Sequence, residues 1–94
     1  MNKYEVMYII QSMDEEATKA MVEKFSKLVT DNGGTVDNID EWGKRRLAYP
    51  INDLNEGYYV LMNFSSSPDF PTELERNFKI TDGILRYMVI RVEE

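Results

Sequence analysis

The stretch Lys3-Tyr4-Glu5-Val6-Met7-Tyr8-Ile9-Ile10 alternates between two sets of side chains along its whole length. One set is Tyr4, Val6, Tyr8 and Ile10, and the other is Lys3, Glu5, Met7 and Ile9. A period of two is the pattern of a β-strand, whose successive side chains point to opposite faces of a sheet. The stretch therefore predicts a strand with two chemically different faces.

A helix of about 18 residues is predicted between Ser12 and Gly33. Ser12 and Glu15 have the spacing of a capping box, and the acids at positions 14–16 suit the positive end of a helix dipole. Gly33 offers a left-handed stop. The apolar residues recur at spacings of three and four, as expected for a helix that covers a sheet. They are Ala17, Met21, Phe25, Leu28 and Val29.

A long second strand is predicted from Thr35 to Pro50, with a bulge near Gly43. Pro50 cannot donate to a sheet ladder, which favours an edge strand or a strand end. The polar run 52–57 predicts a turn into a third strand, from Tyr58 to Phe64. On that strand the predicted core side is Tyr58, Val60, Met62 and Phe64.

A second helix and a fourth strand complete the chain. Ser67 is a candidate cap, Pro68 or Pro71 is tolerated in the first turn, and an apolar stripe follows at spacings of four. That stripe is Phe70, Leu74 and Phe78. The last strand runs from Ile84 to Val92, with Leu85, Tyr87 and Val89 on one side and Ile84, Arg86, Met88, Ile90 and Val92 on the other.

The order β-α-β-β-α-β in a single domain of residues 1–94 predicts an α+β, ferredoxin-like fold. This arrangement is a four-stranded antiparallel sheet with two helices on one face. Strands one and three are then central, strand two is an edge, and the other face of the sheet is open. Loops covering that face would be the alternative. An open face predicts an apolar interaction surface for a partner protein, made of Met7, Ile9, Leu61, Met88 and Ile90, with Trp42 also facing outward.

Composition excludes most kinds of active site. The chain has no Cys and no His, so it lacks thiolate ligands, the usual zinc ligand and the commonest general base. Asp40 and Glu41 are adjacent, so on a strand they would point apart and not form an acid/base pair. We expect no catalysis, cofactor, metal or small-molecule substrate. Neither a membrane span nor a signal peptide is evident, which predicts a cytoplasmic protein.

Three consecutive cations, Lys44, Arg45 and Arg46, stand out in a chain of net charge −6. Together with Trp42 and Tyr49 they can contact phosphate or a protein partner. The alternative is a solvated edge strand whose charges prevent aggregation. Parity predicts Lys44 and Arg46 on one side, Arg45 on the other, and Tyr49 in the core. RNA contacts are predicted at Arg45, Arg46 and Arg86, with Lys44 and Lys3 as weaker point charges.

The run Gly43-Lys44-Arg45-Arg46-Leu47-Ala48-Tyr49-Pro50-Ile51 resembles the signature of the bacterial small-subunit ribosomal protein family S-six. Further likeness lies at Tyr4-Glu5-Val6, at Gly57-Tyr58, and at Arg86 with Met88-Val89. The resemblance implies a ribosomal protein that binds small-subunit ribosomal RNA in the platform. It also implies a heterodimer with the partner protein S-eighteen.

Other functions of the same fold fit the residues less well. An RNA-recognition motif needs a basic residue and outward aromatics in the third strand, where this chain has Glu56 and Asn63. Only Tyr59 points outward there, so stacking of single-stranded bases is not expected. A ferredoxin-like dimeric regulatory or small-ligand-binding module is the alternative function.

Overall fold

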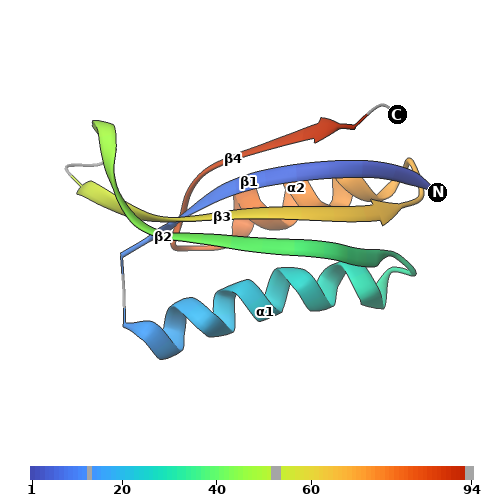
Figure 1. The fold of residues 1–94 in the computed structure, drawn as a ribbon, viewed down its shortest axis with the longest axis horizontal. Helices are drawn as coiled ribbons and strands as arrows, with labels where there is room; N and C mark the ends of the chain where they lie inside the picture. Colours follow the sequence, from blue (N-terminus) through green and yellow to red (C-terminus); the bar gives the residue numbers. More distant parts are fainter. Residues whose placement is uncertain (13, 52–53, 93–94) are drawn as a thin grey trace.

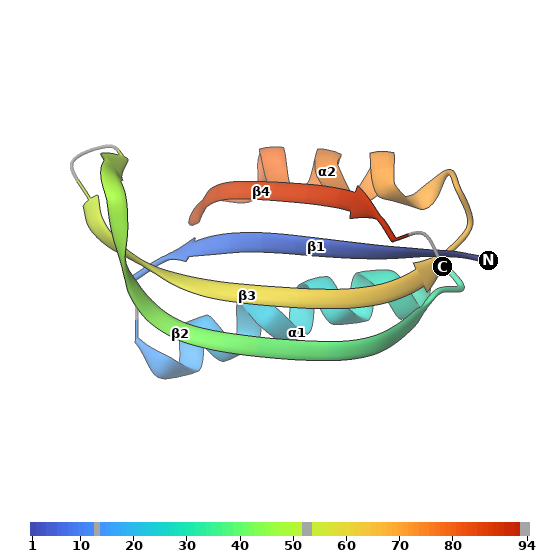
Figure 2. The same ribbon diagram turned by 45° about the horizontal axis from the view of Figure 1, so that its top comes forward.

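The computed structural model describes residues 1–12, 14–51 and 54–92, without the side chains of residues 47–51 and 54–55. Its elements are β1 (Asn2–Gln11), α1 (Glu15–Asp31), β2 (Thr35–Ile51), β3 (Leu54–Ser66), α2 (Phe70–Ile80) and β4 (Ile84–Arg91). The strands form one antiparallel sheet in the order β2-β3-β1-β4. Both helices pack on the same face of the sheet (Figures 1 and 2). The predicted ferredoxin-like fold is confirmed.

The core lies between the helices and the sheet, and its centre is a cluster of aromatic rings. Phe25 of α1 lies 4.4 Å from Phe78 of α2 and 5.4 Å from Tyr8 of β1, measured between ring centroids. All three side chains are buried. The predicted buried sides of β1 and β3 are confirmed, except that Tyr58 is only half-buried. Because every second residue of these strands is apolar, one face of the sheet closes against both helices.

The start of α1 differs from the prediction. Its N-cap is Asp14, whose Oδ1 accepts the Ala17 N–H at 2.7 Å, and the predicted cap Ser12 lies before it. Asp is as good an N-cap as Ser, so an acid at the right backbone position takes the role. The predicted stop at Gly33 is confirmed: its φ is +82°, and its N–H donates to the Thr30 carbonyl at 3.1 Å.

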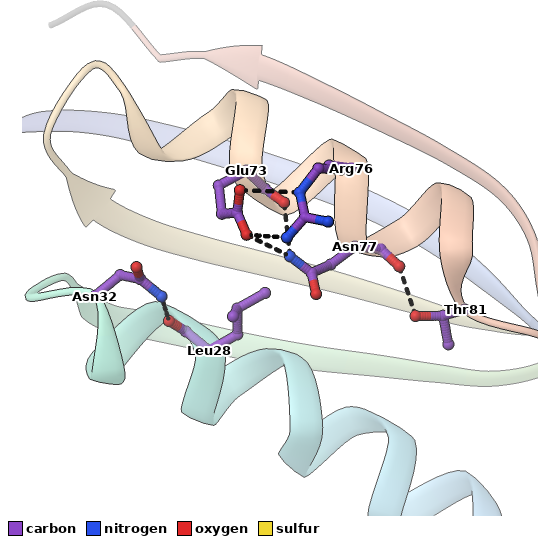
Figure 3. Close-up of polar contacts among 6 residues, drawn as sticks. All are labelled: Leu28, Asn32, Glu73, Arg76, Asn77 and Thr81. Carbon is purple, nitrogen blue, oxygen red and sulfur yellow. Dashed lines mark hydrogen bonds and ion pairs between the residues drawn. The ribbon is translucent and has the colours of Figure 1, made fainter.

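The second helix also begins later than Ser67, so that predicted cap is wrong. The N-cap position is Asp69, which makes no side-chain capping bond, and the Ser67 carbonyl accepts the Phe70 N–H at 3.2 Å. Polar side chains form an ion pair on the surface of α2 and a hydrogen bond at its C-terminal end (Figure 3). Arg76 pairs with Glu73 at 2.6 Å, and Thr81 Oγ1 donates to the Asn77 carbonyl at 2.5 Å.

Strands β2 and β3 continue past the end of β1 as a two-stranded ribbon that curls away from the sheet (Figures 1 and 2). Arg46 pairs with Glu56 in this ribbon, and Ile51 pairs with Leu54. The prediction that residues 54–57 form a turn is therefore wrong, because they pair with β2. Asn52 and Asp53 lie outside the described residues, as does the side chain of Tyr49, so its predicted burial stays a prediction.

A bulge interrupts the pairing of β2 with β3 at the predicted place. Glu41 pairs with Val60 and Gly43 pairs with Tyr59, so Trp42 is the extra residue. Gly43 has a φ of +81°, a backbone conformation that glycine adopts without strain. Trp42 shares the face of Asp40, opposite the helices, where its ring stacks with that of Tyr59. The bulge brings Gly43 to this face as well and turns Lys44 to the helix side.

Candidate functional site

The open face of the sheet is organised in rows of residues that pair across the strands. One row joins Asp40, Leu61, Met7 and Met88, and the next joins Gly43, Tyr59, Ile9 and Arg86. The first row thus brings together three of the apolar residues predicted for a partner interface. Ile90 pairs with Glu5 one row further on. We call Met7, Leu61, Met88 and Ile90 the apolar patch.

The apolar patch is exposed at one end and partly covered at the other. Met88 is 62% exposed and Ile90 is 49% exposed, while Met7 and Leu61 are half-buried. A shallow hollow of about 70 Å³ lies among Met7, Met88, Ile90 and Glu5. The alternative that loops cover this face is therefore wrong for Met88 and Ile90.

Ile9 does not belong to the exposed surface, so the prediction that it does is wrong. It is only 6% exposed, although it lies on the open face. Its neighbours in the row are the two longer side chains of Tyr59 and Arg86, which flank it on both sides. A side chain shorter than both of its cross-strand neighbours is shielded by them.

Trp42 faces outward, as predicted, and is held in place by two contacts. Its Nε1–H donates to Asp40 Oδ2 at 3.0 Å. Its ring stacks on that of Tyr59, with centroids 6.4 Å apart and planes 4° from parallel. The side chain is 39% exposed. The sequence did not reveal this stack, because the two residues lie on different strands and meet only through the register of β2 against β3.

All five predicted cations are exposed, but they lie on two surfaces. Arg45 pairs with Gly57 and shares the open face with Arg86 and Lys3. Lys44 pairs with Tyr58, which faces the helices, and Arg46 has the same parity. The predicted alternation of Lys44, Arg45 and Arg46 is confirmed. The structure does not gather the five into one patch.

Lys44 lines a cavity of about 480 Å³ on the helix side, which the sequence did not predict. The cavity is also lined by Asp14, Glu15 and Glu41. The Tyr58 hydroxyl donates to Glu41 Oε1 at 3.1 Å, and partial burial together with this bond raises the pKa of Tyr58. The three carboxylates outnumber the two ammonium groups of Lys44 and Lys19 in this cavity, which makes it unsuited to phosphate, so Lys44 is a weaker candidate than the arginines.

Two further observations concern other kinds of site. No helix in the described part of the chain is long and apolar enough to cross a membrane. Among residues 1–12, 14–51 and 54–92, no group of three acids could hold a metal ion.

Comparison with known proteins gives one consistent result. Residues 3–91 match the family model described as Ribosomal protein S6. The chain is 56% identical to the small ribosomal subunit protein bS6 of Clostridium novyi and 54% identical to that of Caldanaerobacter subterraneus, each over 95 aligned positions covering the whole of both chains. The crystal structure of 30S ribosomal protein S6 from Thermotoga maritima superposes with a TM-score of 0.91 at 31% identity, covering 97% of this chain and 87% of that one.

Proposed function

The chain belongs to the ribosomal protein S6 family, and from this premise we propose that it binds small-subunit ribosomal RNA in the platform, jointly with the basic partner protein S-eighteen. As a member of the family it is a structural protein of the small ribosomal subunit, not an enzyme. Its place is the ribosome, in the cytoplasm. The alternative of a dimeric regulatory or small-ligand-binding module is set aside by this membership.

The observation that carries the proposal is the open face, where cations and the apolar patch lie next to each other. Arg86 is exposed two residues before Met88 on the same side of β4, and Lys3 and Arg45 share that face. Arg forms forked contacts with phosphate oxygens, while apolar side chains suit a protein surface. We therefore assign the apolar patch to the partner protein, and Arg45, Arg86 and Lys3 to RNA.

The acidity of the chain explains why a partner is needed. A net charge of −6 repels an RNA polyanion, and few cations are available to release its counterions. A basic protein docked on the apolar patch would add positive charge beside Arg86. Arg46, and more weakly Lys44, would contact RNA from the helix side of the ribbon.

Titration of a platform RNA fragment tests this function. The fragment is titrated with this protein alone, with the partner alone and with both. We expect weak binding by this protein alone, cooperative binding by the pair, and a smaller salt dependence for this protein than for the pair. Equal affinities with and without the partner would contradict the proposal.

Two arginine variants test the assignment of the cations, and a third is their control. Arg46→Ala and Arg86→Ala should weaken binding of the pair to RNA, because both side chains are exposed. Arg46→Ala should leave the Tm unchanged, whereas Arg86→Ala should lower it slightly, because Arg86 flanks the buried Ile9. Arg76→Ala is the matched control, since Arg76 is exposed on α2 and pairs with Glu73. An unchanged affinity together with a large loss of thermal stability would show Arg46 or Arg86 to be structural.

A further inference from the structure

We propose that Trp42 and Tyr59 form a stacking platform for one unpaired RNA base, with Arg45 and Arg86 contacting the adjoining phosphates. This inference rests on the RNA binding proposed above. It differs from the sequence-based prediction in two respects: Trp42 was assigned to the protein partner, and base stacking was not expected. The prediction against stacking counts only the outward rings of the third strand, where Tyr59 is alone, and does not include Trp42 of the neighbouring strand.

The rings are arranged for a third ring to join them. The Trp42 and Tyr59 planes differ by 4°, with the ring centroids 6.4 Å apart, so the two rings are nearly parallel. β2 is an edge strand and the Trp42 side chain is 39% exposed, so part of the indole surface is accessible to a ligand. A flat base laid against this accessible surface would continue the parallel arrangement of rings, and stacking of this kind is favourable for every base.

The indole is also fixed before any ligand arrives. The bond from Nε1 to Asp40 and the contact with Tyr59 hold it from two directions. Gly43, the next residue, takes part in the bulge at a φ of +81°. A side chain that is already ordered loses little conformational entropy on binding, so the contact favours affinity.

The charges around the platform match a nucleotide better than a protein surface. Arg45 lies two residues beyond Gly43 on the same face, about 7 Å along the strand. Arg86 lies in the row of Tyr59, on the far side of the buried Ile9. The nearest carboxylate, Asp40, accepts the indole N–H. Two flanking cations around a flat apolar surface fit the phosphates and base of RNA, whereas the apolar patch toward β4 fits a protein.

Fluorescence provides a site-specific test, because Trp42 is the only tryptophan in the chain. The platform RNA fragment is added to the heterodimer with the partner protein, and the Trp42 emission is recorded. A base stacked on the indole should quench this emission. Trp42→Leu should lower RNA affinity roughly 5- to 150-fold, which corresponds to the usual strength of one base–aromatic stack. Trp42→Phe, which keeps a ring, should lose less.

Controls separate this site from the others. Ile80→Ala removes an exposed apolar side chain on α2, 66% exposed, and should change neither RNA binding nor heterodimer formation. Formation of the heterodimer should be the same for Trp42→Leu as for the unaltered chain. Circular dichroism of both Trp42 variants, whose substituted side chain is on the surface, verifies folding.

Each contrary result has one meaning. Loss of heterodimer formation in Trp42→Leu, or quenching by the partner before RNA is added, would show that a protein covers the platform and would overturn the inference. Unchanged RNA affinity in Trp42→Leu without quenching would overturn the platform and leave the proposed function standing. A heterodimer of unaltered chains that fails to bind the fragment would overturn both.

Discussion

The two faces of the sheet are built from the same strands, yet one face is buried against the helices and the other is open. On the helix side, Tyr8, Val60 and Phe64 are fully buried. On the open side of the same sheet, Met88 is 62% exposed and Ile90 is 49% exposed. Since neighbouring residues of a strand point to opposite faces, stability and binding are assigned to alternate positions. Substitutions on one face should therefore change the free energy of unfolding, and substitutions on the other should change affinity.

The strongest test of this division is a deletion at the centre of the core. Phe25→Ala removes a ring that contacts both Tyr8 and Phe78 and is fully buried. The free energy of unfolding should fall by about 3–5 kcal/mol, the usual cost of truncating a buried aromatic side chain. Urea denaturation measures it. A loss below about 1 kcal/mol would mean that the cluster does not hold the helices to the sheet.

The second test is a substitution of the glycine in the bulge, where successive residues of β2 change faces. Gly43→Ala should lower the free energy of unfolding by about 1–2 kcal/mol, because the residue has a φ of +81°, which is strained for alanine. No steric clash adds to this cost, since the added methyl would meet nothing within 4 Å. The backbone can relieve this strain if the bulge shifts, and such a shift would displace Trp42. RNA binding should therefore weaken as well.

Gly33→Ala is the matched control for this change. Its φ is +82° and the space around it is equally open, but it lies at the end of α1, away from the open face. We expect a similar loss of stability, measured by urea denaturation, with RNA affinity unchanged. Equal losses of RNA affinity in both variants would show that the effect of Gly43→Ala is general destabilisation.

The sequence predicts the faces well because they depend on a local period. Alternation along β1 and β3 and the apolar stripes of α1 and α2 depend only on positions within one element. Two of the predictions that failed depend on other elements. Ile9 is buried by Tyr59 and Arg86 from neighbouring strands, and residues 54–57 are extended because β2 pairs with them. The stack of Trp42 on Tyr59 depends on the register of β2 against β3, which no pattern within one strand specifies.

A third test concerns Tyr8, whose hydroxyl is buried and has no hydrogen-bond partner among the described residues. Tyr8→Phe removes this uncompensated group, so stability at pH 7 should stay the same or rise by about 1 kcal/mol. Tyr4→Phe is the control, because the Tyr4 hydroxyl accepts a bond from Asn2 Nδ2 at 3.2 Å. That change should cost about 1 kcal/mol. Urea denaturation of both variants measures the difference.

Tyr8 should also make stability depend on pH in alkaline solution. Burial, and then the negative charge of Glu41, raises the pKa of Tyr8 far above its ordinary value. Above about pH 10 the unfolded chain releases the proton of this tyrosine while the folded chain keeps it, so stability falls as the pH rises. Tyr8→Phe should reduce the fall between pH 9 and pH 11. An identical fall in both proteins would assign it to other groups.

The smallest change in stability is expected for Met88→Ala, and it separates the two faces most sharply. Met88 is 62% exposed on the open face, so its truncation should alter the free energy of unfolding by less than about 0.5 kcal/mol. Its neighbour Val89 faces the helices and packs against the core, so Val89→Ala should cost about 1 kcal/mol. Affinity for the partner protein, measured by calorimetry, should reverse this order, because only Met88 belongs to the apolar patch. If Met88→Ala destabilised the chain as much as Val89→Ala and left partner affinity unchanged, the open face would belong to the fold and not to binding.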